Sequence, residues 1–344
     1  MENCPFPIEL CEAVIDGTIP WPTHIRRYSP PLAQLTVQRT LYACALTCRA
    51  WRTRAQRLLW SYVYLKNAPT AISFASASRI ASGECRSLLS TLCIGEELRG
   101  TLIDEKHLAV TDLANVNELF MLPFPNLFTL HCTAVRFNLG PGVLRMRLPF
   151  FSTGSLNTLV LRLCIFDSAR AFLDLVWAFP NLSHLHVVYG KLRREILTPV
   201  GAAHLASVGN QLQAGRRLTS VNFHHLNRLF GGSIGIMLTR SVFGPTLTHL
   251  ILTFYDLDDA QCTSTLLAGE PSSFPSLILL NVKLTHRCSD SFGFGMGRIQ
   301  SVLELVISSS TGSPSKLERS LWGAQRKSLA KRNGCESVFP ISAN

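Results

Sequence analysis

The stretch that decides the fold is FPNLSHLHV, residues 179–187. Pro180 marks the end of a preceding helix, because proline lacks the N–H that a continuing helix needs. Leu182, Leu185 and Val187 then follow in the pattern L-x-x-L-x-L. Residues two apart point to the same face of a strand. The stretch therefore predicts a turn followed by a short strand with one apolar face.

The same pattern recurs along the chain, which indicates an internal repeat. Successive copies start at residues 127, 156, 182, 218, 247 and 277, at intervals of 26 to 36 residues. Weaker copies start at Leu89 and Val302, and residues 169–176 have the apolar spacing of a helix. We expect the strands of the six main copies to stack in parallel and to bury one continuous apolar face. The apolar positions of the six copies are Leu127, Leu130, Cys132, Leu156, Leu159, Leu161, Leu182, Leu185, Val187, Leu218, Val221, Phe223, Leu247, Leu250, Leu252, Leu277, Leu280 and Val282.

This array resembles the leucine-rich repeats, which have a period of about 20–29 residues. Their consensus places Asn or Cys eight residues after the first leucine, and here only the second copy complies, with Cys164. The resemblance implies an irregular α/β solenoid over residues 67–311. The alternative is an α/β domain in which the leucine spacing is coincidental. In residues 312–344, the capping-box spacing of Ser315 and Glu318 predicts a helix that caps the solenoid, with a localisation signal as the alternative.

The first 66 residues have a different, all-helical character. Pro7 suits the first position of a helix, and apolar residues recur at helical spacing as far as Ile15. A second helix is expected from Thr40 to Leu59, after a loop insertion at residues 20–38. These short helices carry more apolar residues than so small a unit can bury by itself, which predicts a partner surface. The alternative is a small helical unit that only closes the end of a larger domain.

Three segments of this region resemble an F-box of the type found in large fungal families. Phe6-Pro7-Ile8-Glu9-Leu10 resembles its Leu-Pro-x-Glu-Ile opening, residues 41–51 resemble its central segment, and residues 59–65 match its close. The resemblance implies that these helices dock on the adaptor subunit, and through it the cullin, of an SCF-type cullin–RING E3 ubiquitin ligase. The adaptor-binding residues that it implies are Phe6, Pro7, Ile8, Leu10, Val14, Ile15, Leu41, Ala45, Leu46, Cys48, Trp51 and Trp60.

Composition restricts the other classes of function. The net charge of +11 is spread along the chain without a basic arm or interleaved aromatic residues, so we expect no nucleic-acid partner. The eleven cysteines include no C-x-x-C pair, and no apolar run approaches the ~18 residues of a membrane span. We therefore expect no membrane partner and a reduced, intracellular protein, located in the cytoplasm, the nucleus or both.

One catalytic motif occurs, but its context argues against catalysis. Gly231-Gly232-Ser233-Ile234-Gly235 satisfies G-x-S-x-G, and Asp258 and His286 follow in the order of an α/β-hydrolase triad. A nucleophile elbow needs a strand directly before the serine, whereas residues 227–230 are typical of a return loop. We interpret the segment as a flexible loop. The sequence contains no P-loop, dinucleotide fingerprint or metal-ligand spacing, so we expect a non-catalytic protein without cofactor or metal.

Histidines gather on the polar face of the predicted strands. The third, fifth and seventh positions of each copy should point away from the apolar core, and they hold five of the ten histidines. One hypothesis is a target-binding surface whose affinity for an acidic partner rises as histidine is protonated, below a pKa of ~6.5. The alternative is that these histidines have no function. The candidate target-binding residues are His131, Arg162, His184, His186, Asn222, His224, His249, Asn281 and Lys283.

Together these features predict a substrate-recognition subunit of a cullin–RING ubiquitin ligase, with a helical adaptor-binding end and a repeat array that holds an unidentified target protein. The alternative is a protein-interaction scaffold that has the same fold and no role in ubiquitination.

Overall fold

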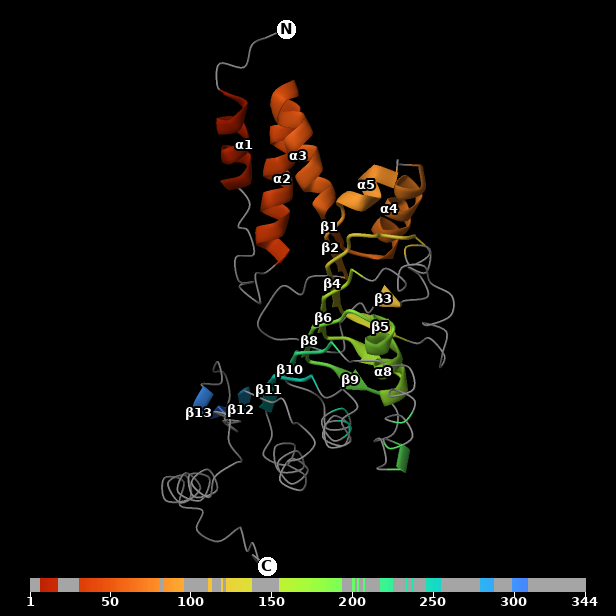
Figure 1. Ribbon diagram of the computed structural model, residues 1–344, viewed down its shortest axis with the longest axis vertical. Coiled ribbons are helices and arrows are strands. Elements are labelled where there is room, and N and C mark those ends of the chain that lie inside the picture. The colour runs from red at the N-terminus through yellow and green to blue at the C-terminus, as the bar shows by residue number, and fades with distance from the viewer. Residues whose placement is uncertain are drawn as a thin grey trace, which may run out of the picture.

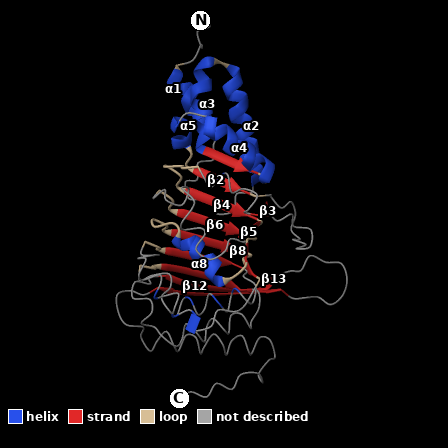
Figure 2. Cartoon of the chain, turned by 90° about the vertical axis from the view of Figure 1, so that its right-hand side faces the viewer, coloured by secondary structure: helices blue, strands red, loops and turns tan. Residues whose placement is uncertain are grey.

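The computed structural model describes residues 7–17, 31–80, 83–95, 111–112, 119, 122–137, 155–193, 217–224, 246–254, 279–287 and 299–308, with isolated helical positions between 200 and 237. Helices form one end of the molecule, and strands stack one below another beneath them (Figures 1 and 2). The fold is mixed α and β with a mostly parallel sheet, which confirms the predicted class at that level. The helix predicted in residues 312–344 lies outside the described residues.

Three helices make the N-terminal end: α1 (Ile8–Gly17), α2 (Pro31–Thr47) and α3 (Arg49–Ser61). The prediction of a loop as far as residue 38 was wrong, because α2 begins at Pro31. Proline is well accommodated at the first position of a helix, where its missing N–H costs nothing. The helical spacing that continues from Thr40 to Leu59 is divided between two helices, α2 and α3. Cys48, with φ −155° and ψ 166°, has extended backbone and separates α2 from α3.

The main sheet contains nine strands in the described part of the chain, and they follow one another in chain order. All neighbours are parallel except the last two, and each of the six repeated patterns forms one strand. In order the strands are β1 (Tyr62–Leu65), β2 (Thr91–Ile94), β4 (Thr129–Thr133), β6 (Thr158–Arg162), β8 (His184–Val188), β10 (Ser220–His224), β11 (His249–Phe254), β12 (Leu279–Arg287) and β13 (Ile299–Ser308).

The weaker copy at Val302 departs from the parallel stack, because β13 pairs antiparallel with β12. A parallel neighbour needs a crossover of about a dozen residues or more, usually with a helix. The connection at residues 288–298 is shorter than that. The weaker copy therefore forms a strand of the sheet, but one that runs opposite to the strands of the six main copies.

A second, smaller sheet lies beside the first and is formed by β3 (Thr111–Asp112), β5 (Val135–Phe137), β7 (Ile165–Phe166) and β9 (Lys191–Leu192) (Figure 1). The chain enters β5 and β7 through Ala134 and Leu163, and it leaves β8 towards β9 through Tyr189. These three residues have φ values of 53° to 56°. Each donates its N–H to the carbonyl at the end of the next main-sheet strand, at 2.7–2.8 Å. These left-handed corners therefore join one repeat to the next.

The main core lies between the two sheets, and phenylalanine rings fill much of it. Phe137 and Phe166 stack with ring centroids 4.9 Å apart. The ring of Phe172, on α8 (Ala169–Trp177), is edge-to-face with the rings of Phe166 and Phe230, at centroid separations of 5.2 and 5.0 Å. All of these rings are at most 2% exposed, as are most leucines of the repeats. The helix predicted from the spacing of residues 169–176 is confirmed.

The helical end joins the sheet without a linker. Helix α3 ends at Ser61, and β1 begins at Tyr62. The ring of Trp60 packs against that of Phe74 of α4 (Ala68–Ile80), with ring centroids 5.9 Å apart. Phe74 in turn stacks on the buried Phe124, with centroids 6.3 Å apart. Helix α5 (Gly83–Leu88) also packs against α3. The first strand of the sheet is thus a direct continuation of the helical end.

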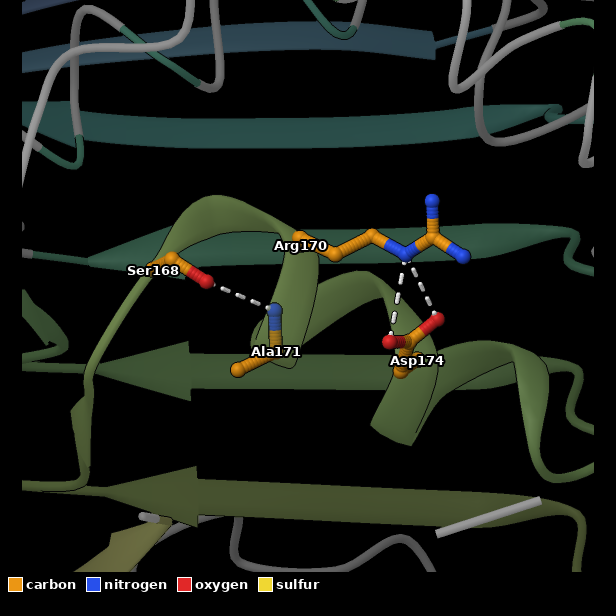
Figure 3. Close-up of polar contacts among 4 residues, drawn as sticks. All are labelled: Ser168, Arg170, Ala171 and Asp174. Atoms are coloured by element: carbon orange, nitrogen blue, oxygen red, sulfur yellow. Dashed lines mark hydrogen bonds and ion pairs between the residues drawn. The ribbon is translucent and has the colours of Figure 1, made fainter. Parts of the chain in front are cut away.

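Helix α8 is capped at its N-terminus by a side chain and carries an ion pair to a buried carboxylate (Figure 3). Ser168 Oγ accepts a hydrogen bond from the N–H of Ala171 at 3.1 Å. Arg170, in the same first turn, donates its Nε hydrogen to both carboxylate oxygens of Asp174, one turn further along the helix, at 3.0 and 3.2 Å. The Asp174 side chain is only 2% exposed, so Arg170 supplies the charge that a buried carboxylate needs.

We expect Ser168→Ala to lower the free energy of unfolding by about 1 kcal/mol, because it removes the acceptor for one N–H of the first helical turn. Urea unfolding followed by circular dichroism measures the change. Ser168→Asp, which restores an acceptor, is the matched control and should lie within a few tenths of a kcal/mol of wild type. Equal losses in both variants would contradict a capping role.

Candidate functional site

Two apolar stripes lie exposed on the helical end. Leu10 and Val14, one turn apart on α1, are 57% and 55% exposed. Tyr42 and Leu46, one turn apart on α2, are 62% and 71% exposed. Exposed apolar side chains paired at helical spacing are typical of a surface that meets a partner. We call these four residues the apolar stripes.

The apolar stripe on α2 borders a groove between α2 and α3. The groove has a volume of about 300 Å³, and its floor is partly apolar. The predicted adaptor contacts included three of its seven lining residues but missed Tyr42, Arg52, Gln56 and Leu59. The spacing of Tyr42 to Leu46 and of Gln56 to Trp60, four residues in each pair, is the signal that would have found two of them. The lining residues are Tyr42, Ala45, Leu46, Arg52, Gln56, Leu59 and Trp60.

Two of the residues implied as adaptor contacts lie inside the helical end. Ile15 is 0% and Leu41 is 3% exposed, and they form its core with Cys44, Ala55 and Leu58. Because a buried side chain cannot contact a docked partner, the implied contact role was wrong for Ile15 and Leu41, which hold the helices together.

The other implied contacts that the structure describes are either exposed or partly buried. Leu10, Val14 and Leu46 are exposed, as is Pro7 at the start of α1. Four more are partly buried, among them Trp60 against Phe74. Phe6 and the side chain of Ile8 lie outside the described residues. The partly buried positions are Ala45, Cys48, Trp51 and Trp60.

An ion pair fixes α1 against α3. Arg54 Nε and Nη2 donate to the two oxygens of Asp16 at 2.9 and 2.7 Å, in a bidentate arrangement. The hydrogen bond to Asp16 raises the pKa of Arg54, so the guanidinium stays charged. Two parallel hydrogen bonds also set the relative orientation of the helices. Because α2 also packs closely on α3, the ion pair fixes the stripe on α1 relative to the α2–α3 pair that carries the other stripe.

The second candidate surface is the side of the main sheet that faces away from α8 and the small sheet. The apolar repeat positions point to the core, and the alternate positions of the same strands point outward. We call the outward positions of β4 to β11 the polar strand face. Its described side chains are Thr129, His131, Thr133, Thr158, Val160, Arg162, His184, His186, Val188, Ser220, Asn222, His224, His249, Ile251 and Thr253.

This face is less exposed than the alternation predicted. His249 is exposed, whereas His131, Arg162, His184, His186 and His224 are partly buried. Asn222 is only 2% exposed, so its prediction as a target contact was wrong for the surface described. Neighbouring strands lie ~4.8 Å apart, and their side chains shield one another. Asn281 and Lys283 occupy outward register positions of β12, beside Ile251 and Thr253.

Burial controls the titration of several groups near this face. Dehydration lowers the pKa of His131 from 6.5 to about 4. It raises the pKa of Cys93, beside His131 in register, and of Cys164, to about 12, and that of Cys132 well above its usual value. These thiols are therefore protonated at neutral pH, and a thiol in that state is a poor nucleophile and metal ligand.

The G-x-S-x-G segment does not form an accessible nucleophile. Phe230, Ser233 and Met237 are helical and 0% exposed, so the interpretation as a flexible loop was wrong. Their spacing of three and four residues places them on one helix face, which packs on the core. Among the described residues, no group of three or more His, Cys, Asp or Glu side chains is arranged to hold a metal ion. No helix in the described ranges combines the length and apolarity that a membrane crossing requires.

A scan against models of known protein families finds no match to this chain, and a search of curated proteins finds none either.

Proposed function

We propose that this chain is the substrate-recognition subunit of an SCF-type cullin–RING E3 ubiquitin ligase. In this proposal the helical end is an F-box that docks on the adaptor subunit, and the strands form a leucine-rich-repeat-like solenoid that holds a target protein. The observation that carries the proposal is the pair of apolar stripes on α1 and α2, because Leu10, Val14, Tyr42 and Leu46 are more than half exposed. The F-box-like residues at 6–10, 41–51 and 59–65 support the identity of the partner.

The chain would contribute no chemistry of its own. Holding a target beside a charged ubiquitin-conjugating enzyme raises the effective concentration of its lysines, which turns a bimolecular encounter into an intramolecular one. The helical end would set the position of the chain in the ligase, and the polar strand face would bind the target.

We expect charged substitutions in the apolar stripes to remove adaptor binding. Leu46→Asp, and separately Leu10→Asp with Val14→Asp, should weaken the affinity of the full chain for a purified adaptor subunit by at least about tenfold, because each places a carboxylate in an apolar interface. Ile80→Asp on α4, where Ile80 is 89% exposed, is the matched control and should bind like wild type. Co-purification and titration calorimetry measure the affinities.

Two results would contradict the proposal. Wild-type chain that recovers neither adaptor nor cullin would favour the interaction scaffold without a role in ubiquitination. Wild-type binding that survives both sets of substitutions in the stripes would place the adaptor on another surface.

A further inference from the structure

Three exposed arginines border the groove between α2 and α3, and within the described part of the chain no carboxylate forms an ion pair with them. Arg52 lines the groove, and Arg49 lies one turn before it on the same side of α3. Arg39 lies one turn before Tyr42, on the side of α2 that carries the apolar stripe. Neither α2 nor α3 contains an Asp or Glu. We call Arg39, Arg49 and Arg52 the groove arginines.

The acidic side chains described at the helical end lie away from the groove. Asp16 is engaged by Arg54, which lies about 200° around α3 from the groove residue two positions before it. That hydrogen bond raises the pKa of Arg54, and the nearby Glu12 adds to the effect. Glu9 is exposed on α1, which packs on α3 beside this ion pair. Glu84 belongs to α5, and its side chain lies outside the described residues. None of the described carboxylates is therefore placed to neutralise the groove arginines.

The antiparallel arrangement of α2 and α3 places positive charge at both ends of the groove. Only Cys48 separates the two helices, and Gln38 Nε2 of α2 donates to the carbonyl oxygen of Tyr62, just after α3, at 3.5 Å. Arg39 therefore lies near the end of α3, whereas the other two groove arginines lie near its beginning, beside Leu46. Arg39 and Leu46 are seven residues apart on α2, which is about 10 Å or two helical turns.

The groove arginines of α3 occupy positions that the helix itself disfavours. Arg49 and Arg52 are among its first four residues, where α3 has no acidic residue and no side-chain cap from Cys48. The N-terminal end of a helix carries a partial positive charge, so a cation in the first turn costs stability. Residues that go against a local preference are expected at functional sites. Arginine at both positions therefore favours a negatively charged ligand.

We propose that this groove binds an amphipathic helix of a partner protein, one with Asp or Glu on the flanks of its apolar stripe. The apolar stripe of such a helix would pack on Ala45, Leu46, Leu59 and Trp60, which line the groove. Carboxylates two turns apart on that helix would reach arginines at both ends. The inference rests on the proposed function only in assigning this helix to the adaptor subunit.

The shape of the site favours a helix over other anionic partners. The groove is an apolar recess of about 300 Å³ with arginines at its ends. A nucleic acid would use aromatic side chains interleaved with basic residues, on which successive bases stack. A membrane surface would use a broad apolar face that enters the lipid. A recess between two helices instead fits the ridge of side chains along a third helix.

The experiment measures binding of the full chain to two fluorescently labelled helical peptides of about 20 residues, with anisotropy as the readout. Both peptides carry one leucine stripe at helical spacing, with Ala and Gln elsewhere. The flanks of the stripe are Glu in the first peptide and Lys in the second. We expect the Glu peptide to bind at least about tenfold tighter than the Lys peptide. This preference should shrink as salt rises from about 0.1 M to about 1 M, because the Debye length falls from ~10 to ~3 Å.

Reversal of a single charge tests the groove directly. Arg52→Glu should weaken binding of the Glu peptide by at least about tenfold and tighten binding of the Lys peptide. Arg57→Glu is the matched control, because Arg57 is exposed on α3 but does not line the groove, and it should change either affinity by less than about threefold. Urea unfolding separates binding from folding. Arg52→Glu should not lower the unfolding midpoint, because an acidic residue suits the first turn of a helix. Arg39→Glu, at the other end of the groove, is the second variant and should also weaken the Glu peptide.

Several results would overturn the inference. Equal binding of the two peptides, no effect of Arg52→Glu, or an equal loss in Arg57→Glu would each do so. Tighter binding of a single-stranded oligonucleotide or of phosphatidylserine vesicles, or self-association in sedimentation, would assign the groove to that partner if Arg52→Glu abolished it. No adaptor takes part in this assay. A chain that binds the adaptor but neither peptide contradicts this inference alone, and one that binds the Glu peptide but not the adaptor contradicts the proposed function alone.

Discussion

We expect Gly95→Ala to lower the free energy of unfolding by about 4 kcal/mol or more. Gly95 follows β2 with φ 112°, a conformation that residues with a Cβ rarely adopt. A Cβ built at this position would lie 1.7 Å from the carbonyl oxygen of Thr133 and 2.7 Å from its carbonyl carbon. Backbone strain and overpacking each cost about 1–3 kcal/mol, and Gly95→Ala introduces both. The added Cβ would meet the main chain of Thr133 in β4, which pairs with β2 and cannot move aside as a side chain could.

Two other glycines provide controls for this effect. A Cβ on Gly83, at the start of α5, would meet only the far end of the Arg86 side chain, at 4.0 Å, so Gly83→Ala should change stability by less than about 1 kcal/mol. A Cβ on Gly190 would lie 2.5 Å from the Phe230 ring, and Gly190→Ala should give an intermediate loss because a side chain can shift. Urea unfolding ranks the three variants. A Gly95→Ala protein as stable as Gly83→Ala would show that the corner after β2 differs from the one described.

We expect His131 to make the fold sensitive to acid. Its pKa is lowered from 6.5 to about 4 by burial, so the unfolded chain binds a proton that the folded chain does not bind between these values. Stability is therefore full above pH 6.5 and falls as the pH drops towards 4. Linkage gives a loss of about 2.5 kcal/mol from this residue between pH 7.5 and pH 4.5.

The measurement compares wild type with His131→Asn in urea unfolding across this pH range. The free energy of unfolding of wild type, minus that of the variant, should fall by about 2.5 kcal/mol between pH 7.5 and pH 4.5, because only wild type carries this imidazole with its lowered pKa. His249→Asn removes an exposed imidazole from the same face and is the matched control for the loss of a histidine. A pH-independent difference between wild type and His131→Asn would show that this imidazole is hydrated in the folded protein.

The parallel strands could be predicted from the sequence because their signal is local. Leu182, Leu185 and Val187 lie within six residues, and that spacing by itself fixes which face of β8 is buried. Helix α8 was predictable for the same reason. The left-handed corners at Ala134, Leu163 and Tyr189 were not, because none is a glycine or asparagine and the conformation is imposed by hydrogen bonds to the next repeat.

The candidate surfaces were less predictable than the strands, because exposure depends on contacts between distant segments. Ile15 and Leu10 have the same apolar character and lie on one short helix, yet Ile15 is buried against the rest of the helical end and Leu10 is 57% exposed. Only the packing of α1 on α3, which Arg54 and Asp16 hold in place, separates core from surface. Similarly, no property of Asn222 in the sequence distinguishes it from the partly buried His224 two residues later.

Because α3 continues directly into β1, the position of a strand in the sheet determines its distance from the helical end. Each strand stands at a fixed height below the helical end, and neighbouring strands are ~4.8 Å apart with a twist of about 20°. Under the proposed function, the strand that holds the target then sets which of its lysines reaches the conjugating enzyme. Insertion or deletion of one repeat between the helical end and the bound target would shift all lysines of the target by one such step. A different lysine would then reach the conjugating enzyme, although the residues that bind the target stay the same.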